Sequence, residues 1–140
     1  MAREELRLDR QLCFPLYAAA RKVTGAYEPI LKQIGLTYTQ YVTMMCLWER
    51  NGSSVKELGE RLFLDSGTLS PLIRTLIEKG LVEKRRSEED ERVVCVYLTE
   101  QGKKLEEKAA SVPAKIASCL PLTKEEATAL YSALYKLLAN

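Results

Sequence analysis

Apolar side chains near the start of the chain recur with the spacing of one face of an α-helix. The positions, three or four residues apart, are Leu12, Leu16, Ala20, Val23, Tyr27, Leu31 and Ile34. This spacing predicts a long helix. Pro15 suits the first turn of such a helix, where its missing N–H removes no internal hydrogen bond. Pro29 lies within the stripe and predicts a kink, and Gly35 marks the end of the helix.

Three later sites pair a hydroxyl side chain with Glu or Gln three residues further on. They are Thr37 with Gln40, Ser54 with Glu57, and Thr123 with Glu126. Such a capping box begins a helix, because each side chain bonds a backbone N–H of the first turn. The first box predicts a helix that stops near Asn51 and Gly52. The second predicts a short helix through VKELGERLF, and the third predicts the closing helix of the chain.

The pattern then changes twice. A four-residue interruption, LDSG, leads to the stretch TLSPLIRTLIEKG, which carries the apolar face of another helix and ends at Gly80. After Gly80, LVEKRR and the β-branched run RVVCVYL flank the charged tip SEEDE, which predicts a β-hairpin. The following stretch, residues 99–120, indicates a polar helix that is bent or broken near Pro113.

This order of elements predicts a mainly α fold with a small β-hairpin, in one domain of residues 1–140. A short helix, a turn, a second helix and a hairpin are the parts of a winged helix-turn-helix, whose second helix enters the major groove of DNA. We therefore assign residues 37–99 to DNA binding. Residues 8–36 and 100–140 are expected to be dimerisation helices, since both carry apolar stripes. An ordinary helical domain decorated with a hairpin remains the alternative.

Composition narrows the class of protein. With 140 residues, 46% hydrophobic and 29% charged, the chain suits one core. The charged start MAREELRLDR and the lack of a long apolar run predict neither a signal peptide nor a membrane span, so we expect a cytoplasmic protein. The chain has no histidine, and its four cysteines form no close pair. We therefore expect no metal site, no cofactor and no imidazole chemistry.

Charge alone does not indicate a nucleic-acid partner. The formal net charge is +2, and residues 54–92 contain eight basic and nine acidic residues, whereas DNA-binding domains usually carry a basic excess. The positions of the charges are more favourable to DNA binding than their sum. The KRR run at 84–86, which includes Arg86, and Arg92 flank the hairpin tip, Arg74 lies on the second helix of the motif, and the acids cluster in EEDE. Asp90 is expected to pair with Arg92 and fix its guanidinium for a narrow groove. A solvated charged loop, or a winged helix that binds only protein, remains open.

Three stretches together carry a resemblance to a known family. They are LCFPLYAAARKVTGAYEPILKQIGLTYTQY, LGERLFLDSGTLSPL and RRSEEDERVVCVYLTEQG. In them the chain resembles the MarR family of winged-helix repressors, and more narrowly its organic hydroperoxide resistance regulator branch. The resemblance implies a homodimer that represses transcription on double-stranded operator DNA. It also implies that an organic hydroperoxide oxidises the N-terminal cysteine and thereby releases the DNA.

Carried over by position, the resemblance assigns a redox-sensing site. Cys13 matches the peroxide-reactive cysteine, Tyr27 and Tyr38 match tyrosines that hydrogen-bond its thiolate, and Tyr17 lies beside the site. Cys119 lies close to the resolving cysteine of two-cysteine members, although its register differs by about one residue. An intersubunit Cys13–Cys119 disulfide is the preferred hypothesis, with a small cellular thiol as the competing partner.

The resemblance also assigns DNA contacts. Ser66, Thr68 and Ser70 match positions that read the major groove. Arg92 matches the wing-tip arginine that enters the minor groove, with Asp90 orienting it.

The spacing of the redox residues bears on how they can meet. Tyr27 is fourteen residues after Cys13, which along one helix is about 21 Å at a rise of about 1.5 Å per residue. The two side chains therefore cannot touch within one chain. If both tyrosines contact the thiol, they must come from a second subunit whose first helix runs antiparallel. Core aromatic residues without a sensing role are the alternative.

Other functions remain open. Cys46 and Cys95 lie in apolar runs and are expected to be inert core residues. A MarR-type repressor released by a small aromatic ligand would share the fold without needing cysteine chemistry. A thiol peroxidase also uses an acidic thiol, but the chain lacks an α/β pattern, and we expect no enzyme activity.

Overall fold

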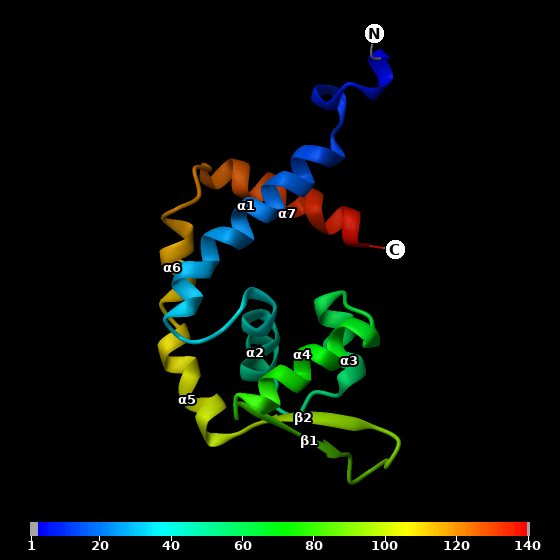
Figure 1. Ribbon diagram of the computed structural model, residues 1–140, viewed down its shortest axis with the longest axis vertical. Coiled ribbons are helices and arrows are strands. Elements are labelled where there is room, and N and C mark those ends of the chain that lie inside the picture. The colour runs from blue at the N-terminus through cyan, green and yellow to red at the C-terminus, as the bar shows by residue number, and fades with distance from the viewer. Residues whose placement is uncertain (1–2, 140) are drawn as a thin grey trace.

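Seven α-helices and one antiparallel β-hairpin make up the structure, a computed structural model that describes residues 3–139 (Figure 1). In chain order the elements are the 3₁₀ turns η1 (Glu4–Leu6) and η2 (Leu8–Arg10), then α1 (Cys13–Lys32), α2 (Tyr38–Glu49), α3 (Val55–Leu62), α4 (Ser66–Glu78), β1 (Val82–Arg86), β2 (Val94–Leu98), α5 (Glu100–Ala109), α6 (Val112–Ala117) and α7 (Lys124–Leu138). The predicted mainly α fold with a small hairpin is confirmed.

The first helix begins and ends close to where its sequence predicts. Pro15 lies in the first turn of α1, and Pro29 lies in the last turns without interrupting the helix. Gly35 then adopts a φ of +74°, a left-handed conformation that glycine enters without steric penalty. The Leu36 N–H donates back to the Leu31 carbonyl at 3.1 Å, which closes the helix end.

All three predicted capping boxes are present, at the starts of α2, α3 and α7. The predicted start of the next helix, after an LDSG interruption, is wrong by two residues. Helix α4 begins at Ser66, because the Asp65 carboxylate accepts a hydrogen bond from the Thr68 N–H at 2.8 Å and caps the helix. The turn before it contains Phe63, whose φ of 56° is also left-handed.

The core joins α2, α4 and the hairpin. The strands pair antiparallel from Val82 opposite Leu98 to Arg86 opposite Val94. The Trp48 indole N–H donates to the Gly102 carbonyl at 2.9 Å, which ties α5 to α2. Only glycine fits at position 102, since a Cβ atom there would overlap the Leu81 carbonyl oxygen. The polar helix expected after the hairpin is broken as predicted, between α5 and α6, and Pro113 is the second residue of α6.

The terminal helices lie at one end of the molecule and the hairpin at the other, with α5 and α6 along one side between them (Figure 1). In α7 every side chain is exposed except that of Leu134, which is partly buried. The first part of α1 is exposed as well, and Leu12, which immediately precedes it, is 85% exposed. Within residues 3–139, no helix is both long and apolar enough to cross a membrane.

Candidate functional site

Three tyrosines form a cluster where α1 meets α2. The ring of Tyr27, from α1, lies 4.8 Å from the ring of Tyr38 and 5.9 Å from that of Tyr41, measured between centroids. Tyr38 and Tyr41 are three residues apart on α2, so their side chains share a face. The structure thus brings together two of the predicted redox residues, Tyr27 and Tyr38. Sequence reasoning missed Tyr41 as a site residue, although its spacing from Tyr38 was visible.

The environment of the cluster keeps its phenols protonated. Burial raises the pKa of Tyr27 above its ordinary value of 10.0, and the neighbouring Tyr38 and Tyr41 raise it further. Burial also raises the pKa of Tyr38 and of Tyr41. A protonated phenol is a hydrogen-bond donor. At neutral pH the cluster therefore offers O–H donors.

Cys13 lies at the opposite end of α1 from this cluster. It is the first residue of the helix, and its side chain is exposed. Because α1 is one continuous helix, Cys13 and Tyr27 are separated by about 21 Å along its axis. Tyr38 contacts Tyr27, so it is equally remote from Cys13 of the same chain. The structure does not bring the thiol and the tyrosine cluster together within one chain.

Two further predicted redox residues are exposed. Tyr17 lies one turn after Cys13, and the Arg21 guanidinium stacks over its ring at 5.5 Å from the centroid. Cys119 follows α6, and its thiol donates to the Lys115 carbonyl at 3.4 Å. Its pairing with Cys13 stays a prediction.

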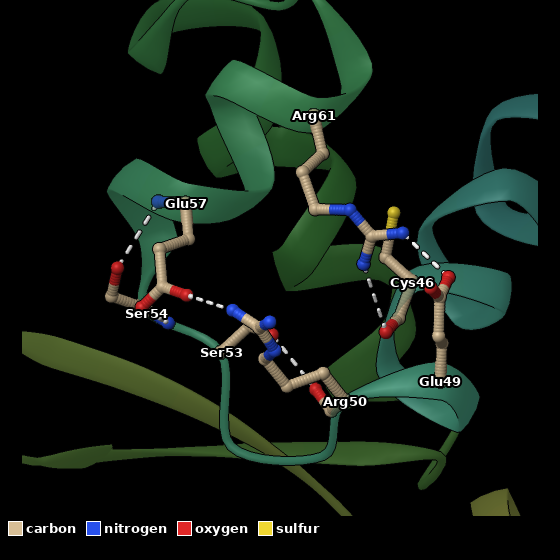
Figure 2. Close-up of polar contacts among 7 residues, drawn as sticks. All are labelled: Cys46, Glu49, Arg50, Ser53, Ser54, Glu57 and Arg61. Carbon is tan, nitrogen blue, oxygen red and sulfur yellow. Dashed lines mark hydrogen bonds and ion pairs between the residues drawn. The ribbon is translucent and has the colours of Figure 1, made fainter.

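The predicted core location of Cys46 and Cys95 is confirmed, since both are buried. Figure 2 shows Cys46 on α2 beside the Arg61 side chain of α3. Arg61 donates to the Cys46 carbonyl at 3.4 Å and to the Glu49 carboxylate at 2.6 Å, which joins the two helices. Burial raises the pKa of the Cys46 thiol, and the positive charge of Arg61 opposes this only in part. A protonated buried thiol is a poor nucleophile.

The predicted DNA-contacting residues of α4 lie on its surface. Ser66, Ser70 and Arg74 are exposed and follow one another at four-residue intervals, which places them on one face. Thr68 is exposed near the N-terminal end of the same helix. The opposite face carries Leu69, Leu72, Ile73 and Leu76, all buried in the core. Packing thus fixes α4 with its polar face outward.

At the hairpin tip, the expected pairing of Asp90 with Arg92 is present. The Arg92 guanidinium donates through Nε and Nη2 to the two Asp90 oxygens, at 3.1 and 3.2 Å. The Arg92 backbone N–H donates to the same carboxylate at 3.0 Å. These bonds lower the pKa of Asp90 below its ordinary value of 3.8. The Arg92 side chain is 90% exposed, so a fixed guanidinium faces solvent.

Arg86 has a structural partner within the tip. Its Nη1 donates to the Glu91 carbonyl at 2.8 Å, so it braces the loop that carries Arg92. Its predicted DNA contact stays a prediction. Arg85, which the sequence placed in the basic KRR run beside the tip, stacks its guanidinium on the Tyr97 ring at 3.9 Å from the centroid. Among residues 3–139, no group of three or more His, Cys, Asp or Glu side chains is arranged to hold a metal ion.

Residues 25–109 match the family model described as transcriptional regulator SarA/Rot. The chain is 44% identical over 135 residues to the organic hydroperoxide resistance transcriptional regulator of Bacillus subtilis, covering 96% of this chain and 92% of that protein.

Solved structures of AbfR, a protein of Staphylococcus epidermidis, have the same fold. Reduced AbfR bound to DNA superposes with a TM-score of 0.79 and is 36% identical, covering 96% of this chain and 94% of that one. The disulfide form of AbfR superposes less well, with a TM-score of 0.65 at 36% identity, covering 96% and 92% of the two chains.

Proposed function

This chain belongs to the MarR family of winged-helix transcriptional regulators, which bind DNA, and we propose that it is a repressor that senses organic hydroperoxides through Cys13. Oxidation of Cys13 would release operator DNA in the cytoplasm. The observation that carries the proposal is the cluster of packed tyrosine rings at one end of α1, two of them partly buried and Tyr41 buried, with an exposed thiol at the other end. Within one chain, Cys13 is too far from the tyrosine cluster to contact it.

A second copy of the chain supplies the missing half. Leu12, just before α1, and Phe14 and Leu16 in its first turns are exposed, and α7 exposes a stripe that includes Leu130 and Tyr131. Apolar faces of this kind are stabilised when a partner removes them from water. If two α1 helices pack antiparallel about a twofold axis, Cys13 of one copy lies near the tyrosine cluster of the other. We therefore propose a homodimer with two shared sensor sites.

The chemistry follows from the thiol and the phenol donors. Phenol O–H groups that donate to the Cys13 sulfur favour its thiolate. The thiolate attacks the terminal, hydroxyl-bearing oxygen of the peroxide, so that an S–O bond forms and the O–O bond breaks. The departing alkoxide takes up from solvent the proton that the thiol had released, and leaves as an alcohol. Cys13 is then a sulfenic acid. A second thiol, from Cys119 or from a small cellular thiol, attacks its sulfur, forming a disulfide and releasing water.

The DNA side of the proposal uses the exposed faces of α4 and the hairpin. Ser66, Thr68 and Ser70, together with Arg74, face the major groove, and Arg92 enters the minor groove beside Arg86. A dimer must hold its two α4 helices about 34 Å apart to reach successive major grooves. A disulfide that draws Cys13 from its tyrosines shifts the helices that set this distance. AbfR has been solved bound to DNA in reduced and in overoxidized form, and also in a disulfide form, which supports a scheme in which the disulfide is the releasing event.

A second candidate function has its own supporting observation. A cavity of about 660 Å³ opens between α1 and the start of α2, lined by Arg21, Thr24, Lys32 and Tyr38 among others. Cations beside an aromatic ring suit an anionic aromatic ligand. The alternative is a repressor released by such a ligand without cysteine oxidation.

One experiment separates the two. A DNA duplex is first selected by the reduced protein from a random-sequence library. The protein then receives one equivalent of cumene hydroperoxide, and mass spectrometry of each cysteine accompanies a gel-shift assay on that duplex. We expect oxidation at Cys13, with buried Cys46 and Cys95 as internal controls, and loss of the shifted band. A Cys13→Ser variant should keep its band, and release of that variant by peroxide would refute the sensor role.

A further inference from the structure

Gln40 is a buried amide whose hydrogen bonds join two parts of the fold. Gln40 as a whole is only 5% exposed. Its Oε1 accepts from the Thr37 backbone N–H at 3.0 Å, as part of the capping box that begins α2. Its Nε2 donates to the Thr75 hydroxyl at 2.9 Å, and Thr75 belongs to α4. The same amide thus caps α2 and holds the C-terminal half of α4.

Lys79 completes this connection from the end of α4. Its ammonium donates to Gln40 Oε1 at 2.7 Å and to the Gly35 carbonyl at 2.6 Å. Gly35 is the residue with positive φ that closes α1. The charge of Lys79 also suits its position, because a cation at a helix C-terminus complements the helix dipole. One flexible side chain therefore bonds the α1–α2 turn to the end of α4.

The network begins beside the tyrosine cluster. Thr37 immediately precedes Tyr38, the first residue of α2, whose ring packs on Tyr27. It ends on the helix whose other end carries Ser66, Thr68 and Ser70. A buried polar group that loses its hydrogen-bond partner destabilises the fold. Displacement of the α1–α2 turn alone would break these bonds, so it is opposed unless α4 moves with the turn.

We propose that Gln40 and Lys79 are positioning residues that couple the tyrosine cluster to the orientation of α4. This inference rests on the proposed function for the event that disturbs the tyrosines, namely the departure of Cys13 on oxidation. The disturbance reaches Thr37 through Tyr38, passes to the Gln40 amide, and is transmitted to α4 through Thr75 and Lys79. Without the network, Cys13 would still be oxidised, but α4 would not respond.

The first test compares wild type, Lys79→Met and Lys104→Met on the selected duplex. Lys104, on α5, is exposed and lines, together with Lys79, a second cavity distinct from the one between α1 and α2. Its substitution therefore removes the same charge without removing a bond of the network. We expect Cys13 oxidation to be equal in all three proteins. Oxidation should raise Kd by about tenfold or more in wild type and Lys104→Met, but only by roughly twofold in Lys79→Met. An undiminished rise in Lys79→Met would overturn the proposal.

A second measurement needs no peroxide, and so decides the coupling even if the sensor proposal fails. In the reduced protein, Tyr38→Leu keeps apolar bulk but alters the cluster, and its effect on Kd is measured with and without Lys79→Met. We expect a weakening by several-fold with Lys79 present and a much smaller one without it, because coupled residues are non-additive. Equal fold-changes in both backgrounds would contradict the inference. Tyr27→Leu, from the other side of the ring contact, replaces Tyr38→Leu if the latter does not melt cooperatively.

Failure of the sensor proposal has a different signature. Wild-type protein would then be oxidised at Cys13 with no change in Kd, whereas the peroxide-free cycle would still show non-additive effects. Thr75→Val, which removes the hydroxyl that accepts from Gln40 at 2.9 Å, should reproduce the Lys79→Met result in that cycle. An additive Thr75→Val cycle would exclude the Gln40–Thr75 branch of the network.

Discussion

The ring of Tyr27 meets the ring of Tyr38 edge-on, with 4.8 Å between their centroids and an interplanar angle of 64°. This contact joins the end of α1 to the start of α2. It also fixes two phenols side by side, with their pKa values raised by burial. Under the proposed function, the pair donates hydrogen bonds to the Cys13 thiolate of a second copy of the chain.

Removal of the Tyr27 hydroxyl tests this role. Tyr27→Phe keeps the ring contact but loses one donor to the Cys13 thiolate. We expect the rate of Cys13 oxidation to fall at least about tenfold, because a hydrogen bond to a charged group is worth on the order of 1.5–3 kcal/mol. Stopped-flow oxidation with cumene hydroperoxide measures the rate. Tyr97→Phe, in the hairpin, is the matched control, and an unchanged rate in Tyr27→Phe would remove the phenol from the site.

Cys119 is tested by the covalent state of the oxidised protein. A nonreducing gel after hydroperoxide treatment should show a disulfide-linked dimer in wild type, and Cys119→Ser should lack it. The exposed position of both thiols permits the reaction once two copies meet. A dimer band that persists in Cys119→Ser would exclude Cys119 as the resolving thiol. In the absence of any dimer band, a small thiol added to the assay should appear on Cys13 by mass spectrometry.

Arg92→Ala should weaken binding to the selected duplex by about 1–3 kcal/mol, since the exposed guanidinium at the tip would be lost from the minor groove. Fluorescence anisotropy over a range of salt concentrations measures this change. Lys124→Ala, at the start of α7, removes the same charge far from the hairpin and should have little effect. Equal affinities for Arg92→Ala and wild type would contradict the assignment of the wing.

The pH dependence of the Asp90–Arg92 pair has a defined direction. Hydrogen bonds from Arg92 hold the pKa of Asp90 below 3.8 in the folded protein. The contribution of the pair to folding stability is therefore fully present above that pH. It is lost as pH falls through the lower folded pKa. Carbon NMR of the Asp90 carboxyl should give a midpoint below 3.8, and Arg92→Ala should raise it only part of the way, because the backbone N–H remains. The pKa of Asp65, which is lowered by the Thr68 N–H, should be the same in wild type and in Arg92→Ala.

The exposed stripe of α7 predicts the oligomeric state. Leu130 is 46% exposed in the single chain, so Leu130→Glu should leave the fold of one chain intact while introducing a charge into an apolar contact. We expect sedimentation velocity to show a dimer for wild type and a monomer for the variant. Val93→Glu, at the exposed hairpin tip, is the control for an added carboxylate. A dimeric Leu130→Glu protein would mean that α7 does not form the contact.

Local signals predicted the helix starts well, and long-range partners account for what was missed. Capping boxes succeed because their donors and acceptors lie within four residues, as at Thr37 and Gln40. The start of α4 was placed late because Gly67 was taken as part of an interruption, whereas the Asp65 cap includes it in the first turn. Glycine is tolerated there more easily than in a helix interior.

The site shows the same division. The sequence placed Cys13 and Tyr27 too far apart to touch, since that distance depends only on the rise of a helix. Tyr41 received no role in the site, because periodicity does not distinguish a core ring from one that packs on two other phenols. The bond from Gln40 to α4 could not be predicted from the sequence either. The capping bond of Gln40 is local, but its bond to Thr75 requires α2 and α4 to be packed.

If the proposed function holds, the unbroken length of α1 makes sensing depend on the concentration of the protein in the cell. Since Cys13 and the tyrosine cluster lie at opposite ends of that helix, an isolated chain would carry a thiol without its activating donors. Under the proposed arrangement, dilution below the dimerisation constant would abolish peroxide sensitivity and operator occupancy together. Newly made monomers would then be spared oxidation until they find a partner.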